Sequence, residues 1–170
     1  MKTFFLIMVI AATSVASAMF DVYFVRHDFH HGAVQGFQVL DPSQNSCPDA
    51  KTTRLFDDMQ DVSGNKIGIR CEGSGCRRYR GDDSAYDPSN IDVMEMHLSN
   101  TPGLHWTIYK TGHGKQWEMF DVHGVSRGQC EPVPGNDDWF AHCGQWSGYR
   151  KMRCHSEFSA DFINSHDRGW

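Results

Sequence analysis

The chain has 170 residues, a formal net charge of −5 at neutral pH and ten histidines. This length is typical of one domain that buries a real hydrophobic core. Because nucleic-acid binding depends mainly on clustered lysine and arginine, the mild acidity argues against a general polyanion binder.

The N-terminal segment has the pattern of a cleavable secretory leader. Lys2 supplies one positive charge, residues 4–12 form an apolar run, and Ala16–Ala18 offers the small residues that a signal peptidase recognises. That run is too short to span a bilayer, and no later segment reaches the ~20 apolar residues of a membrane helix. We expect a signal peptide over residues 1–18, one mature domain over residues 19–170, and a secreted, extracellular protein without a membrane segment.

All six cysteines follow the predicted cleavage site, and an even number of cysteines in a secreted chain predicts a disulfide framework. Cys71 and Cys76 are near enough in sequence to close a small ring, but either can also pair with a distant partner. The sequence does not choose among the possible pairings. The predicted disulfide cysteines are Cys47, Cys71, Cys76, Cys130, Cys143 and Cys154.

The first half of the mature chain combines strand patterns with loops and one short helix. Residues 20–25 and 34–40 are rich in aromatic and β-branched residues, which predicts two strands. Residues 49–59 predict a short helix, and residues 66–70 predict another short strand. Residues 72–90 are rich in Gly, Ser, Asp and Arg, which predicts a long exposed loop.

The second half carries the clearest strand signals. Residues 91–98, 104–109 and 117–122 predict three short strands joined by tight turns, which together form an antiparallel meander. Residues 148–154 predict a further strand, and residues 156–164 a short helix capped by Ser156. The predicted fold is mainly β: a single small antiparallel domain, sandwich or barrel-like, with one or two short helices and disulfides. An α+β fold is the alternative.

The first two meander strands place histidines on one face. A turn that pairs Leu98 with Leu104 brings the apolar faces of both strands together, because alternate residues share a face. His97 then lies opposite His105, and Glu95 lies on the same face. Such a cluster suits general acid–base chemistry, and imidazoles also bind zinc or copper. Polar cross-strand pairs on a solvated face are the simpler interpretation.

The third meander strand decides whether the row of histidines is longer. If Phe120 and Val122 share the apolar face, His123 joins the row, whereas a pairing of Lys110 with Trp117 breaks it. The candidate catalytic residues are Glu95, His97, His105, His123 and Tyr109.

Two further groups of residues are candidates for binding. His27, His30 and His31 have spacing that allows a loop to hold a metal, although a polar loop is the simpler interpretation, and we expect no cofactor. Aromatic side chains between Cys130 and Cys154 suit stacking on a sugar or anchoring a partner, or simply cover the core. These candidate binding residues are Trp139, Phe140 and Trp146.

A Lys-Thr-Phe-Phe leader that ends in Ala-Ser-Ala, six cysteines and the lack of an enzyme motif resemble the small cysteine-rich secreted proteins of filamentous fungi. Many of those are candidate effectors that act on a host plant or a competing microbe. The resemblance covers the whole chain through its organisation. It implies an effector-like virulence protein that binds a host protein or cell-wall glycan and modulates host immunity.

A small secreted hydrolase of ribonuclease type is the alternative function. It would use Glu95, His97 and His105 as acid and base, with an arginine or tyrosine on the phosphate. Only in that case do we expect a nucleic acid as partner.

Overall fold

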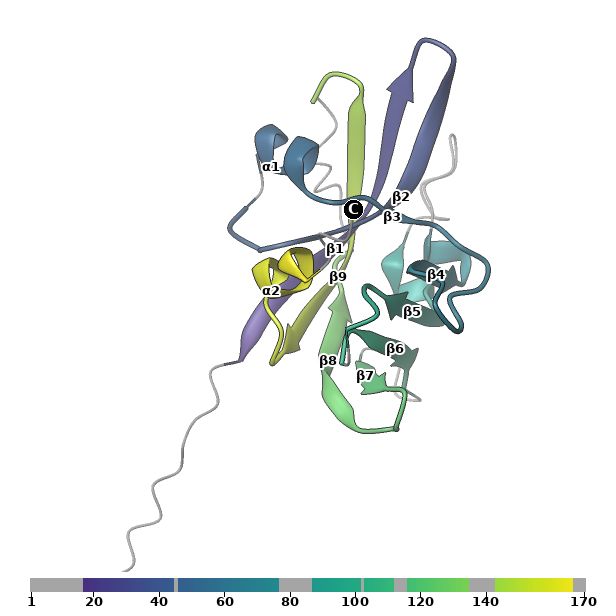
Figure 1. Ribbon diagram of the computed structural model, residues 1–170, viewed down its shortest axis with the longest axis vertical. Helices are drawn as coiled ribbons and strands as arrows, with labels where there is room; N and C mark the ends of the chain where they lie inside the picture. Colours follow the sequence, from purple (N-terminus) through teal and green to yellow (C-terminus); the bar gives the residue numbers. More distant parts are fainter. Residues whose placement is uncertain are drawn as a thin grey trace, which may run out of the picture.

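The computed structural model describes residues 17–44, 46–76, 87–101, 103–111, 116–134 and 143–166. Within these ranges one mostly antiparallel sheet contains nine strands in the order β3-β2-β1-β9-β8-β7-β6-β5-β4. Asp58, which follows β3, forms a parallel bridge with Ile69 in β4 and so joins the two ends of the sheet. The result is a nearly closed barrel (Figure 1), which confirms the predicted mainly β, barrel-like domain.

The strands and helices have the following bounds. The strands are β1 (Ala18–Phe29), β2 (Gly32–Leu40), β3 (Phe56–Asp57), β4 (Gly68–Glu72), β5 (Val93–His97), β6 (His105–Lys110), β7 (Trp117–Asp121), β8 (Ser126–Pro132) and β9 (Trp146–Ser156). The helices are α1 (Cys47–Thr52) and α2 (Ala160–Ser165), with 3-10 turns at Ser74–Cys76 and Pro88–Asn90. No helix in the described ranges is both long and apolar enough to cross a membrane.

The predicted helices differ from those observed. The helix expected over residues 49–59 ends at Thr52, and the chain then forms the short strand β3. The C-terminal helix is capped by Ser159, whose hydroxyl accepts a hydrogen bond from the Phe162 amide at 3.1 Å. The predicted cap, Ser156, is instead the last residue of β9.

The interior of the barrel is filled by alternate side chains of nearly every strand. Two tryptophans are fully buried there, and each finds a partner for its indole N–H. Trp117 donates to the Ile91 carbonyl at 3.0 Å, and Trp106 donates to the Met96 sulfur at 3.3 Å. These contacts fix which face of β6 and β7 points inward.

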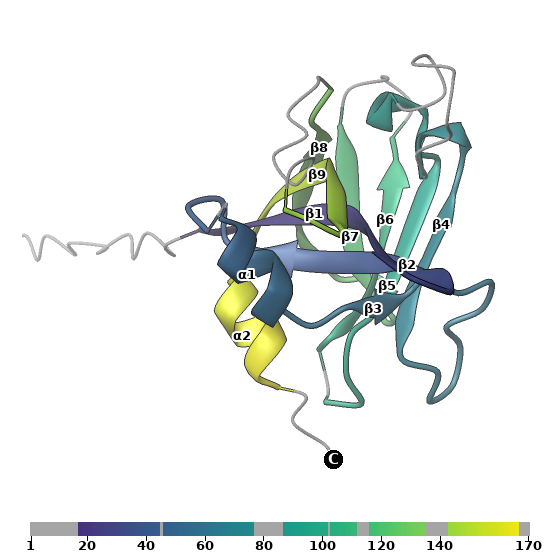
Figure 2. The ribbon, with the colours of Figure 1, turned by 90° about the horizontal axis from the view of Figure 1, so that it is seen from above.

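A second apolar cluster covers the outer face of β2, β1 and β9. It contains Tyr23, Val25, Leu40, Ala50 of α1 and Cys143. Both helices lie on this side of the molecule, away from β4 to β6 (Figure 2). The outer face of the β2–β1–β9 segment is therefore part of the protein interior.

The six cysteines form three disulfides, as predicted. Cys47–Cys143 joins α1 to the start of β9, and Cys71–Cys76 closes the small ring that the sequence allowed. Cys130–Cys154 links two residues that face each other directly in β8 and β9.

Candidate functional site

The predicted pairing of the first two meander strands is confirmed. The Leu98 amide donates a hydrogen bond to the Leu104 carbonyl at 2.9 Å, and His97 faces His105. The two imidazole rings stack with their centroids 4.3 Å apart and their planes 4° from parallel. Because alternate side chains of a strand share a face, this register is enough to place the two histidines next to each other.

Each ring of the pair is held by a different partner. His97 is 4% exposed, and its Nδ1 lies 3.0 Å from the Val62 carbonyl oxygen. A carbonyl only accepts, so Nδ1 carries the proton there, which leaves Nε2 as the second functional nitrogen. The Nε2 of His105 lies 3.0 Å from Oε1 of Glu95. Both orientations are therefore fixed by hydrogen bonds.

Arg70 is a member of this cluster that the sequence interpretation did not identify. It faces Glu95 across β4 and β5, and its Nε donates to Oε2 of that carboxylate at 3.1 Å. Its Nη1 also forms an ion pair with Glu72. The strand that carries Arg70 was predicted, but its pairing with β5 was not, because residues 72–90 separate the two segments.

Of the two registers that the sequence left open for the third meander strand, the structure has the one that breaks the row of histidines. Lys110 pairs with Trp117, so Trp117 and Met119 point inward and Phe120 lies on the outer face. Val122 lies in the turn after β7 and is 63% exposed. The inward position of the larger Trp117 side chain determines this register.

A surface cavity of about 610 Å³ nevertheless brings His123 near the other two histidines. His123 enters from the turn after β7 rather than from a strand. The cavity lies between that turn, the β5–β6 turn and the segment from β9 to α2. Its lining residues are Gly64, Asn65, His97, Ser99, Asn100, Thr101, Gly103, His105, Asp121, Val122, His123, Arg127, Glu157 and Phe158.

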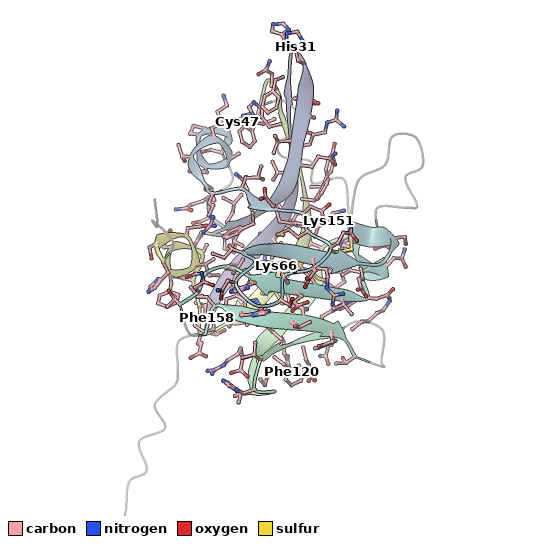
Figure 3. All side chains as sticks on the ribbon, turned by 45° about the vertical axis from the view of Figure 1, so that its right-hand side comes forward. His31, Cys47, Lys66, Phe120, Lys151 and Phe158 are labelled. Atoms are coloured by element: carbon pink, nitrogen blue, oxygen red, sulfur yellow. A yellow bond between two sulfur atoms is a disulfide. The ribbon has the colours of Figure 1, made fainter. Side chains whose placement is uncertain are left out.

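Phe158, near α2, lines this cavity. The loop that carries Lys66 passes in front of the sheet (Figure 3). The Phe158 ring stacks on buried Trp106 with centroids 5.0 Å apart, and it also stacks on Phe162. One wall of the cavity is thus anchored to the core.

The charged groups of the cavity are paired with one another. Asp121 accepts hydrogen bonds from the backbone amides of His123 and Val125, both at 2.9 Å, and from Arg127. These bonds, first that of Val125, lower the pKa of Asp121. Arg127 also contacts Glu157 at 2.8 Å.

Tyr109 and the predicted metal residues lie outside the cavity. Tyr109 is 47% exposed on the outer face of β6, where it contacts Phe120. His27 stacks on Trp146, with ring centroids 4.2 Å apart, and His30 and His31 form the β1–β2 turn. Within the part of the chain that the structure describes, no three His, Cys, Asp or Glu side chains are grouped to hold a metal ion.

Of the three aromatic binding candidates, the structure describes only Trp146. Trp146 lies at the start of β9, half-buried against the cluster that covers the outer face of β1. Trp139 and Phe140 lie outside the described residues.

Comparisons with known proteins identified no relative of this chain. No protein-family model, no curated protein and no solved structure matches this chain.

Proposed function

We propose that this chain is a secreted, effector-type protein that binds a cell-wall glycan in the cavity beside His97, His105 and His123. The observation that carries the proposal is the chemistry of the cavity lining. Three histidines and the side chains of Asn65, Ser99, Asn100 and Thr101 supply hydrogen-bonding groups. Phe158 and Val122 supply apolar contact. A glycan needs both kinds of group from its binding site.

The pairing of charges favours an uncharged ligand. Arg127 is already bound by Asp121 and Glu157, and Arg70 by Glu72 and Glu95. A phosphate ligand would have to compete with two carboxylates for each guanidinium group. Hydroxyl groups can bind without separating these ion pairs, because they are neutral donors and acceptors.

The size and setting of the cavity suit a small segment of a polymer. Its volume of about 610 Å³ lies within the usual range of small-molecule sites. His97, Ser99 and Asp121 are almost fully buried. The site therefore combines fixed polar groups with open access. Secretion is part of the proposal, and the three disulfides are consistent with an extracellular protein.

Titration of the ¹⁵N-labelled mature protein with chitin and β-glucan oligosaccharides tests this function. We expect amide shifts concentrated in residues 97–105 and 121–127, with affinity at least tenfold weaker in His105→Ala. His155→Ala is the matched control, because His155 is an exposed histidine of β9 that does not line the cavity. Shifts elsewhere, or none with either class at millimolar concentration, would overturn the proposal.

Ribonuclease-type cleavage is the second candidate function, favoured by the hydrogen bond between Glu95 and His105 beside His97. In such a reaction one imidazole removes the proton of the ribose 2′-hydroxyl, whose oxygen then attacks phosphorus. The second ring, protonated, donates its proton to the departing 5′-oxygen. This candidate ranks second because both nearby guanidinium groups are already paired with carboxylates.

A cleavage assay separates the two candidates. If the wild-type protein degrades RNA and the double variant His97→Ala, His105→Ala remains folded without that activity, the chain is an enzyme. If the purified wild-type protein leaves RNA intact from mildly acidic to neutral pH, the enzyme candidate is rejected. His155→Ala again serves as the control for general effects of losing a histidine.

A further inference from the structure

Each of the two stacked imidazoles in the cavity has one nitrogen bound by the protein and one nitrogen open. Nδ1 of His97 donates its proton to the Val62 carbonyl at 3.0 Å, in the loop between β3 and β4 (Figure 3). Nε2 of His105 donates its proton to the Glu95 carboxylate at 3.0 Å. Within the described part of the chain, neither ring makes another hydrogen bond. Nε2 of His97 and Nδ1 of His105 therefore remain for a ligand.

Both open nitrogens are hydrogen-bond acceptors. A neutral imidazole has one N–H donor and one acceptor nitrogen, so the position of its proton fixes the role of the other nitrogen. In each ring the bound nitrogen holds the proton, and the open nitrogen carries a lone pair. Among the described residues, neither open nitrogen is one of the buried side-chain atoms that lack a hydrogen bond, and both histidines line the cavity. The pair thus offers a ligand two acceptors and no donor.

The stacking of the rings decides how a ligand can reach these two acceptors. An imidazole lone pair lies in the plane of its ring, and the two planes are 4° from parallel with ring centroids 4.3 Å apart. A single ion cannot lie in both planes, whereas two separate donor groups, one for each plane, can. A sugar ring carries such groups in its hydroxyls, each of which has an O–H donor.

We infer that His97 and His105 select the glycan as a pair of acceptors for two of its hydroxyl or amide N–H groups, and that a proton on Nδ1 of His105 weakens binding. This inference rests on the proposed function. A protonated imidazole has two N–H donors and no acceptor, so one proton removes half of the pair.

His105 is the ring that takes the proton when the medium becomes mildly acidic. Its bound nitrogen faces the carboxylate of Glu95, which favours a positive charge, whereas that of His97 faces a neutral carbonyl. A second proton on His97 would place two positive charges in stacked rings. Unperturbed imidazole gains its proton between about pH 8 and 5, so the change falls in an accessible range.

Most charged groups near the two rings are bound to one another, in ion pairs of Arg70, Arg127 and Lys66. His123 differs, because it lines the cavity and is itself an imidazole, so the test has to separate its effect from that of His105. The charged and titratable groups near the pair are Arg70 of β4, Glu95 of β5, Asp121, His123 and Arg127 from β7 to β8, Glu157 after β9, and Asp61 and Lys66 of the loop that supplies the Val62 carbonyl.

Long-range ¹H–¹⁵N spectra of the imidazoles test the assignment of acceptors in the free protein. At about pH 7.5 we expect the proton on Nδ1 of His97 and on Nε2 of His105. The opposite tautomer in either ring would overturn the inference, whichever sugar binds.

The affinity for chitotriose and laminaritriose at about pH 7.5 and about pH 5.5 tests the effect of the proton. We expect the sugar that binds to do so about fivefold more weakly at the lower pH, which corresponds to one hydrogen bond of ordinary strength. His105→Phe keeps a ring beside His97 but has no nitrogen, so it should bind weakly and equally at both pH values. His155→Ala, the matched control, should keep the pH dependence of the wild type.

The outcomes separate this inference from the proposed function. Equal wild-type affinity at the two pH values, or a pH dependence that persists in His105→Phe, overturns the inference and leaves glycan binding in place. A pH dependence that disappears in His123→Ala but not in His105→Phe would assign it to the wrong ring for this inference. If neither sugar binds at either pH, the proposed function fails and the inference fails with it.

Discussion

The outer face of the same sheet is used in two different ways. On β2, β1 and β9 it is covered by a helix, an apolar cluster and the Cys47–Cys143 disulfide. On β4 to β7 it carries polar side chains that remain partly exposed. Each face holds a carboxylate bound by arginine: Asp21, 1% exposed, bound by Arg153, and Glu95, 20% exposed, bound by Arg70.

The difference in burial gives the two ion pairs different roles. Asp21 is itself 1% exposed and accepts bonds from Arg153 at 2.8 and 2.9 Å and from Arg150 at 3.3 Å, whereas the Arg153 side chain is 30% exposed. Removing one member of a buried pair leaves an uncompensated charge, which is costly. Glu95 remains in contact with solvent, so its ion pair stabilises little. Its bond to His105 instead orients a side chain of the cavity.

Loss of the Cys47–Cys143 disulfide should have the largest effect on stability. This disulfide spans 96 residues, so the double variant Cys47→Ala, Cys143→Ala should lose about 4–5 kcal/mol of unfolding free energy. Cys71–Cys76 spans only 5 residues, and its removal should cost about 2 kcal/mol. Urea unfolding measures the unfolding free energy of both variants. Equal decreases in the two variants would contradict the role of loop length.

Asp21→Ala should be the next most damaging change. It leaves Arg153 without its buried partner, with an expected loss of about 3 kcal/mol of unfolding free energy. The control is Glu157→Ala, which removes an exposed carboxylate from Arg127 and should cost less than ~1 kcal/mol. If Asp21→Ala lowered the unfolding free energy by less than ~1 kcal/mol, the stability of the covered face would depend on apolar packing rather than on this ion pair.

Sequence reasoning succeeded where two neighbouring strands are joined by a short turn. The apolar sides of residues 91–98 and 104–109 match in only one register, which predicts that His97 faces His105. It did not choose between two registers at β7, because two alternations of large apolar residues compete there and only packing selects the inward Trp117. It also missed β8, since Cys130 is the only fully buried side chain of that polar strand.

The cavity depends on contacts that no local pattern encodes. His123 reaches it through a turn that Asp121 holds together, and Glu157 and Phe158 come from the distant segment before α2. Arg70 is separated from Glu95 by a long loop and meets it only because β4 pairs with β5. The disulfide pairing was likewise undetermined, since it follows from the order of strands in the sheet.

The stability contributed by Asp121 should depend on pH. Its pKa is lowered in the folded protein, first by the Val125 amide, so its contribution is present above the unfolded pKa of about 3.9. That contribution is lost as the pH falls through the lower folded pKa. Thermal unfolding should show Asp121→Asn less stable than wild type at neutral pH, with a difference that shrinks as the pH falls below about 3.9. A constant difference over this range would exclude the ionised carboxylate as the cause.

Glu95→Ala should have the smallest effect on stability and the clearest effect on the site. With both members of the ion pair partly exposed, the unfolding free energy should fall by less than ~1 kcal/mol. The His105 ring loses the acceptor of its Nε2 proton, so its stacking on His97 should loosen. Imidazole ¹⁵N–¹H spectra report both effects, through faster exchange of the Nε2 proton and changed His97 shifts. Unchanged spectra together with a loss as large as that of Asp21→Ala would mean that Glu95 is a structural residue, and that the two outer faces of the sheet do not differ in role.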